Sequence, residues 1–179
     1  EDILNNDPVV ITGFSAGVDS YVTLQEYFIN PKTPTKLTHL LFNNLIYKDN
    51  VANDKFIDNK RIADKLNLPL IETKTNLHQF YKKGLGFEQT HTLRNAVIPH
   101  VLSFKGIKFL YSSSFPLKDF AIKKWPDIGI VNSILLPLLS TENTKLFEVG
   151  NEYGRVEKTK IISKMPETYD LLDICIDTK

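Results

Sequence analysis

Apolar and polar residues follow two patterns along this chain. Compact runs rich in β-branched residues predict buried strands, and longer stretches with apolar residues at helical spacing predict helices. The predicted strands are 8–12, 37–42, 69–73 and 108–112. The predicted helices are 19–29, 54–66, 77–83, 92–104 and 158–164. This alternation predicts βαβ units, and therefore an α/β fold with a three-layer, open, mostly parallel sheet that carries helices on both faces.

Proline and glycine residues refine these boundaries. Pro99 lies inside the predicted helix 92–104, where we expect a bend or a break. Two further apolar runs, 134–139 and 145–149, precede a predicted turn at 150–154. We find no repeat or linker, which predicts a single domain over residues 1–179. Because the chain begins with Glu1 rather than Met, we expect a fragment, and a further C-terminal segment stays open.

Composition narrows the classes of protein. With 42% hydrophobic and 24% charged residues, the chain is typical of a globular domain rather than a disordered or collagen-like one. Its 22 Lys and Arg against 21 Asp and Glu predict neither a strong nucleic-acid footprint nor a polybasic membrane patch. A single cysteine, Cys175, excludes an internal disulfide. With no run long enough to span a bilayer, we expect a cytoplasmic protein without a membrane partner.

The sequence Ser-Ala-Gly-Val-Asp-Ser at 15–20 lies between the first predicted strand and its helix. Free backbone N–H groups and the helix dipole at such a position form a ready anion site. Gly17 allows close backbone approach, Ser15 and Ser20 offer hydroxyls, and Asp19 can hold a hydrated Mg²⁺ ion. The alternative is an ordinary turn in which Asp19 and Ser20 cap the helix.

This hexapeptide resembles the SGGxDS pyrophosphate loop of the PP-loop ATP pyrophosphatases, which belong to the adenine-nucleotide alpha-hydrolase-like (HUP) superfamily. Ala16 stands where that pattern has glycine, so the turn is preserved only if the position does not require a positive φ. The segment 93–96, Leu-Arg-Asn-Ala, is similar to the GRN segment of 7-cyano-7-deazaguanine synthases. The segment 154–159 resembles an R-x-E-K segment of the same branch.

The resemblance implies an enzyme that binds ATP with Mg²⁺ and adenylates a small-molecule substrate, releasing pyrophosphate before a nitrogen or sulfur nucleophile displaces AMP. It implies catalytic roles for Asp19, Lys158 and Arg94, with Asp19 also holding the metal. The residues expected to bind the nucleotide are Thr12, Gly13, Phe14, Ser15, Ala16, Gly17, Val18, Asp19, Ser20, Asn43, Asn95, Ser112 and Arg155.

Alternatives stay open for several of these residues. Arg94 suits a phosphate or carboxylate clamp, but a surface salt bridge explains it equally well. Lys158 and Arg155 also fit a solvated basic helix start, and Asn43, Asn95 and Ser112 also fit ordinary turn chemistry. The histidines, at 39, 78, 91 and 100, show no metal-ligand spacing such as His-x-x-x-His. Cys175 fits a buried small hydrophobe better than a nucleophile.

We therefore expect an ATP-dependent enzyme of the ligase or amidotransferase type. Nitrogen transfer is favoured because a sulfur relay normally uses two cysteines, and the zinc-binding cysteines of the deazaguanine branch do not occur in these residues. A tRNA-modifying enzyme and a non-catalytic nucleotide-binding module are the alternatives. Lysines and aromatic residues between 105 and 125 would suit RNA, although we prefer a helix surface beside buried aromatics. Homo-oligomerisation stays open.

Overall fold

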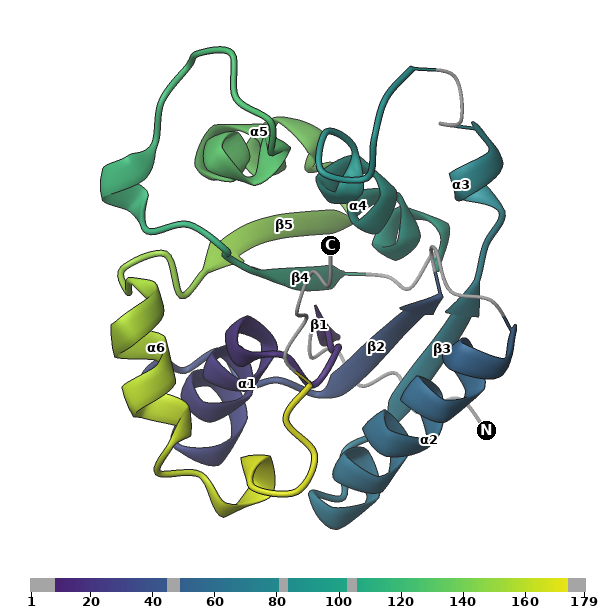
Figure 1. Ribbon diagram of the computed structural model, residues 1–179, viewed down its shortest axis with the longest axis vertical. Coiled ribbons are helices and arrows are strands. Elements are labelled where there is room, and N and C mark those ends of the chain that lie inside the picture. Colours follow the sequence, from purple (N-terminus) through teal and green to yellow (C-terminus); the bar gives the residue numbers. More distant parts are fainter. Residues whose placement is uncertain (1–8, 45–48, 81–83, 103–105, 174–179) are drawn as a thin grey trace.

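The computed structural model describes residues 9–44, 49–80, 84–102 and 106–173 (Figure 1). The strands are β1 (Val10–Gly13), β2 (His39–Asn44), β3 (Leu70–Lys74), β4 (Ile107–Ser112) and β5 (Thr144–Val149). The α-helices are α1 (Val18–Leu24), α2 (Asp49–Lys65), α3 (Leu77–Phe80), α4 (His91–Val101), α5 (Asn132–Leu139) and α6 (Arg155–Ile162). A π-helix (Gln25–Ile29) extends α1, and the 3₁₀ turns are Leu117–Asp119, Ile128–Val131 and Pro166–Thr168.

The strands form one five-stranded parallel sheet in the order β3-β2-β1-β4-β5. β1 lies in the middle, with Ile11 opposite His39 of β2 on one side and opposite Phe109 of β4 on the other. The chain thus builds one half of the sheet from β1 to β3, then crosses to the other side of β1 for β4 and β5. The predicted α/β fold with an open parallel sheet is confirmed.

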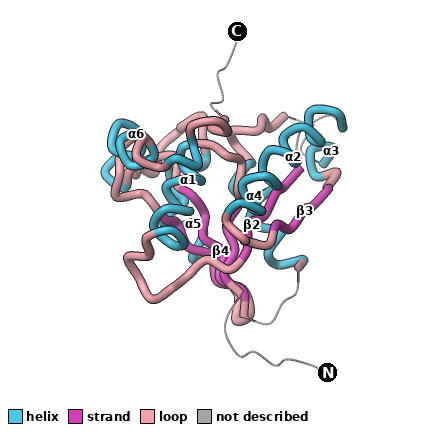
Figure 2. The backbone as a smooth tube through the Cα atoms, turned by 90° about the horizontal axis from the view of Figure 1, so that it is seen from below, coloured by secondary structure: helices cyan, strands magenta, loops and turns pink. Residues whose placement is uncertain are grey.

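Alternation along the strands divides the core into two layers. Val10, Leu40 and Leu110 pack with α1, α2 and α6 on one face of the sheet. Their neighbours Ile11, Leu41 and Phe109 pack with α4 and α5 on the other face. In Figure 1 these two sets of helices lie below and above the sheet, and Figure 2 shows the same arrangement from below, with the strands near the centre. Successive side chains of a strand point to opposite faces, so strands buried on both faces are apolar throughout.

The helices differ from the sequence predictions in several places, and α2 begins at Asp49 rather than at Asp54. α4 continues through the buried Pro99, so the predicted break there is wrong. The apolar run 134–139 lies in α5, with Pro137 inside that helix. α6 begins at Arg155 rather than at Lys158, because the Glu157 carboxylate accepts a 2.7 Å hydrogen bond from the Gly154 N–H and so stabilises an earlier start. Lys158 therefore lies inside the helix.

No helix in the four described ranges combines the length and the apolar character needed to cross a membrane.

Candidate nucleotide site

A cavity of about 300 Å³ opens at the carboxyl edge of the sheet, beside the central strand β1. β1 and β4 are adjacent there, but the chain leaves them toward opposite halves of the sheet. Open α/β sheets bind ligands at such a switch point. The lining residues come from the loop after β1, the ends of β2 and β4, and helices α2 and α4: Gly13, Phe14, Ser15, Asp19, Ser20, Leu41, Phe42, Asn43, Lys55, Asn59, Phe87, Asn95, Phe109, Tyr111, Ser112 and Ser114.

The loop between β1 and α1 presents the start of the helix without a side-chain cap. Gly17 is the N-cap residue, and no side chain among the described residues caps the helix start. The Ser20 hydroxyl donates to the Gly17 carbonyl at 2.9 Å instead of accepting from a backbone N–H. The capping alternative for Asp19 and Ser20 is therefore wrong. Uncapped N–H groups at a helix start, placed beside a cavity, can receive an anion.

Ala16 adopts a left-handed conformation, so the condition that the sequence placed on this position is not met. Its φ is 56°, so the position does require a positive φ and the turn is nevertheless kept with alanine. Such a conformation costs an L-residue about 1–2 kcal/mol. The surroundings hold it in place, because the Asp173 N–H donates to the Ala16 carbonyl at 2.9 Å and the Ala16 side chain is buried.

Asp19 lies between two cations that the sequence places far from it. Lys158 Nζ donates to Asp19 Oδ1 at 2.9 Å, and Arg155 reaches Asp19 Oδ2 at 3.3 Å. Lys158 is fully buried and also donates to the Ser113 carbonyl, whereas Arg155 is exposed. The interpretation of Lys158 as part of a solvated basic helix start is therefore wrong. Positive charge instead gathers next to the uncapped helix start.

This pairing affects the predicted magnesium site. Each Asp19 carboxylate oxygen already contacts a cation, so a Mg²⁺ ion bound there would share an oxygen with Lys158 or Arg155 and be repelled by its positive charge. The phosphate role needs no such change, because the helix start, Lys158 and Arg155 are all electropositive. The residues present fit phosphates directly, and the metal role of Asp19 stays a prediction.

Two polar networks close the cavity walls. Asn43 Nδ2 donates to Asn95 Oδ1 at 3.0 Å, and Asn95 Nδ2 donates to the His91 carbonyl at 2.9 Å. On the other side, the hydroxyls of Ser112 and Thr23 are 2.7 Å apart. Asn43, Asn95 and Ser112 thus line the cavity with hydrogen-bonded side chains, and their nucleotide-binding role stays a prediction.

Asn59 and Lys55 of α2 are cavity residues that the sequence argument missed. They also line an adjoining cavity of about 230 Å³ beneath residues 170–173. Lys55 forms an ion pair with Asp173. Asn59 is 2% exposed, and its Oδ1 has no hydrogen-bond partner among the described residues. A signal existed, because Asn59 shares the helix face of Ile62, Ala63 and Leu66, where a polar residue is out of pattern.

Arg94 lies away from the cavity lining. Its Nε donates to the Thr90 hydroxyl at 2.8 Å and its guanidinium lies over the Phe87 ring at 5.7 Å. At 5% exposure it is buried, so the alternative of a surface salt bridge is wrong. Its catalytic role stays a prediction. The other predicted residues that do not line the cavity are Thr12, Ala16, Gly17, Val18, Arg155 and Lys158.

The lysine-rich and aromatic window is not a helix surface, which corrects that interpretation. In 106–125 the structure has β4, a short 3₁₀ turn and loop, with Trp125 44% exposed and Lys123 Nζ 4.5 Å from the centre of its ring. Lys105 and Cys175 lie outside the described residues.

Comparison with known proteins supports the fold. No protein-family model matches the chain, and no curated protein matches it. Among solved structures, the chain is similar to the U34-tRNA thiolase NcsA from Methanococcus maripaludis with its [4Fe-4S] cluster, with a TM-score of 0.57 and 15% identity. The match covers 91% of this chain and 59% of that one, so the chain spans less than two thirds of this neighbour. At this identity the likeness shows a shared fold.

Proposed function

We propose that this chain is a PP-loop enzyme that binds ATP in the 300 Å³ cavity and adenylates a small-molecule substrate, with release of pyrophosphate. The observation that carries the proposal is the convergence of Asp19, Lys158 and Arg155 at the uncapped start of α1. These residues come from two motifs, and the resemblance to PP-loop proteins implies a role for both in nucleotide binding or catalysis.

In this proposal the loop 15–20 binds the β- and γ-phosphates through its backbone N–H groups. Lys158, held by Asp19 and the Ser113 carbonyl, supplies a fixed positive charge for the departing pyrophosphate. A substrate oxygen attacks the α-phosphorus, the bond to the β-phosphate oxygen breaks, and pyrophosphate leaves with the electron pair. Asn43, Asn95 and Ser112 orient the nucleotide from the strand ends.

Nitrogen transfer is our proposal for the second step. A nitrogen nucleophile attacks the activated carbon of the substrate, and AMP leaves with its oxygen. The 179 residues contain one cysteine, so they do not supply the several thiolates that a sulfur relay or a cysteine-held iron–sulfur cluster uses.

Binding is tested by melting the protein with and without Mg-ATP. Ligand at 100 times its dissociation constant adds about 2.7 kcal/mol of stability. At about 2–4 °C per kcal/mol for a domain of this size, we expect a rise of about 5–11 °C. Asp19→Ala should lose the shift, whereas Asp119→Ala, an exposed aspartate outside the cavity lining, should keep it. An equal shift in Asp19→Ala would contradict the site.

The reaction type is tested by its products. Turnover should yield AMP and pyrophosphate in equal amounts, separated by ion-exchange chromatography, when candidate carboxylic acids and an ammonia source are supplied. ADP and phosphate as products would contradict adenylation. Mg-ATP binding without turnover for any substrate would favour the non-catalytic nucleotide-binding module.

Modification of tRNA remains the second candidate, favoured by the exposed Trp125 and Lys123 and by the fold shared with a U34-tRNA thiolase. Aromatic stacking with neighbouring cations is a common way to hold unpaired bases. Neutralising Lys118, Lys123 and Lys124 to glutamine should then weaken tRNA binding and reduce its salt dependence. An unchanged affinity would count against this candidate.

A further inference from the structure

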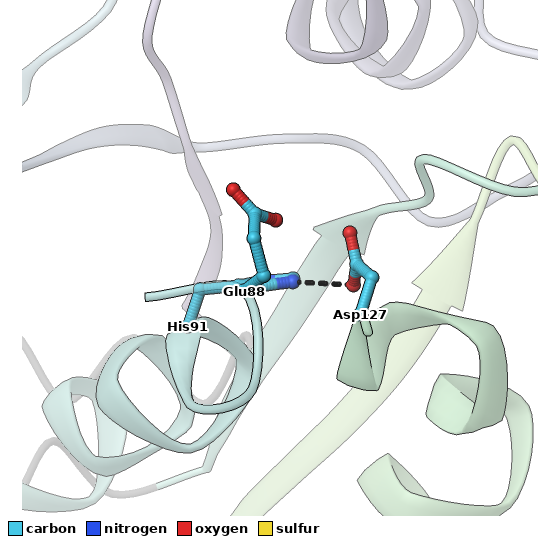
Figure 3. A group of neighbouring side chains, drawn as sticks. All are labelled: Glu88, His91 and Asp127. Atoms are coloured by element: carbon cyan, nitrogen blue, oxygen red, sulfur yellow. Dashed lines mark hydrogen bonds and ion pairs between the residues drawn. The ribbon is translucent and has the colours of Figure 1, made fainter. Parts of the chain in front are cut away.

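Three metal-ligating side chains meet between α4 and the 3₁₀ turn Ile128–Val131. Glu88 lies in the turn before α4, and His91 is the first residue of that helix. Asp127 directly precedes the 3₁₀ turn. One donor atom from each lies within 4.8 Å of the others. Figure 3 shows the His91 ring directed at the Asp127 carboxylate, with the Glu88 carboxylate beside them. His91 and Asp127 are 36 positions apart in sequence, so spacing along the chain does not reveal the group.

The backbone fixes the two segments that carry these ligands. The Ile128 N–H donates to the Glu88 carbonyl at 2.9 Å, which joins the segments directly. The Gly129 N–H donates to Asp127 Oδ1 at 2.7 Å and orients that carboxylate. A metal site needs ligands held near their final positions, and these bonds provide that order.

His91 has the partners that a metal-binding imidazole uses. Its Nε2 lies 2.8 Å from Asp127 Oδ1, and its Nδ1 lies 2.8 Å from the Tyr111 hydroxyl. Metal-ligating histidines nearly always use the second ring nitrogen to donate to an oxygen that fixes the ring. With Nε2 on a metal, the proton resides on Nδ1 and is donated to the Tyr111 oxygen.

We propose that Glu88, His91 and Asp127 form a binding site for a divalent transition-metal ion of the Zn²⁺ class. Zn–N and Zn–O bonds are about 2.0–2.2 Å long, so the ligand atoms around one ion lie about 3–4.4 Å apart. The three donor atoms lie within 4.8 Å of one another and His91 Nε2 lies 2.8 Å from Asp127 Oδ1, so binding would replace the proton between these two atoms and move them slightly apart. One imidazole and two carboxylates suit Zn²⁺ or a neighbouring first-row ion better than Mg²⁺, which prefers oxygen ligands alone. Three protein ligands leave at least one position for water or another ligand.

This site is separate from the predicted nucleotide site and does not depend on its function. Asp19 lies in α1, whereas the three ligands lie at the N-terminal start of α4 and before the 3₁₀ turn Ile128–Val131, and none of them lines the 300 Å³ cavity. Tyr111 and Phe87 do line that cavity, and they contact His91 through a hydrogen bond and a ring contact at 5.6 Å. An ion bound to His91 would therefore restrict the positions of Tyr111 and Phe87 in the cavity wall.

The test is titration of the chelator-treated protein with ZnCl₂ alone, followed by calorimetry. We expect one Zn²⁺ per chain, with micromolar or tighter affinity. Glu88→Gln, which changes an exposed side chain, should weaken binding at least about tenfold. Its matched control is the exposed Glu142→Gln, which should bind as the parent does. His91→Gln should abolish binding, and His100→Gln, in the same helix, should not.

Substitution with Co²⁺ gives an independent readout. The visible absorption of bound Co²⁺ reports its ligands and geometry, and it should change in Glu88→Gln and disappear in His91→Gln. No saturable 1:1 binding would overturn the proposal and leave His91 and Asp127 as a hydrogen-bonded clasp between two loops. Binding that survives His91→Gln, or is within about twofold of the parent in Glu88→Gln, would overturn it as well.

Discussion

Replacing Asp19 with alanine should destabilise the protein even without nucleotide, because it leaves the Lys158 ammonium buried without its counter-ion. The Lys158 side chain is 2% exposed, compared with 21% for Asp19. Removing one partner of a buried ion pair costs about 3–5 kcal/mol. Here the Ser113 carbonyl still accepts from Lys158, so we take the low end, about 3 kcal/mol. The exposed contact to Arg155 adds less than about 1 kcal/mol.

At about 2–4 °C per kcal/mol, a loss of that size lowers the melting temperature by about 6–12 °C. Differential scanning fluorimetry, supported by urea denaturation, measures it in the ligand-free protein. Asp19→Ala combined with Lys158→Met should recover most of the lost stability, because the unpaired charge is removed as well. A melting temperature within about 1 °C of the parent for Asp19→Ala, or no recovery in the double variant, would refute this reasoning.

Two other variants test the buried Asn59 of α2 and the half-buried Glu148 of β5. Asn59→Leu removes a buried oxygen that has no partner among the described residues, so we expect a gain of about 1 kcal/mol, or about 2–4 °C in melting temperature; a fall would contradict that account. Burial raises the pKa of Glu148, so the folded protein favours its protonated form more than the unfolded chain does. The resulting contribution to the free energy of unfolding is complete below the ordinary pKa of 4.5 and is lost as pH rises through the raised pKa. The free energy of unfolding of Glu148→Gln, measured by urea denaturation relative to the parent, should therefore increase from about pH 4 to about pH 7. The same difference from the parent at both pH values would contradict this prediction.

Local sequence signals predicted the central part of the molecule. The β-branched run before Gly13, the small residues that follow and the amphipathic stretch after Asp19 indicated β1, the loop and α1 in the order observed. Lys158 and Arg155 were assigned to the phosphates only through the resemblance. The fold explains their position, because α6 packs beside α1 on the same face of the sheet.

Other features depend on contacts that sequence spacing does not encode. His91, Asp127 and Tyr111 come from a helix, a loop and a strand, and they meet only when the chain has crossed from β3 to β4. Pro99 and Pro137 lie inside helices because tertiary packing on the sheet outweighs their local cost. Arg94 followed a motif that suggested a ligand clamp, but its position on α4 directs it to Thr90 and Phe87.

Ala16 shows that the second residue of the loop motif is selected for its backbone conformation rather than for being glycine. With φ at 56° and the side chain buried, the position selects small residues that tolerate the left-handed region, and it excludes β-branched ones. Alanine satisfies that selection at an energetic cost, so glycine here is a preference and not a requirement. A sequence pattern that requires glycine at both positions therefore misses loops in which another residue adopts the left-handed conformation, as Ala16 does here. Loops of this kind are better compared by the φ angle at this position, because that angle sets the direction of the backbone N–H groups that follow.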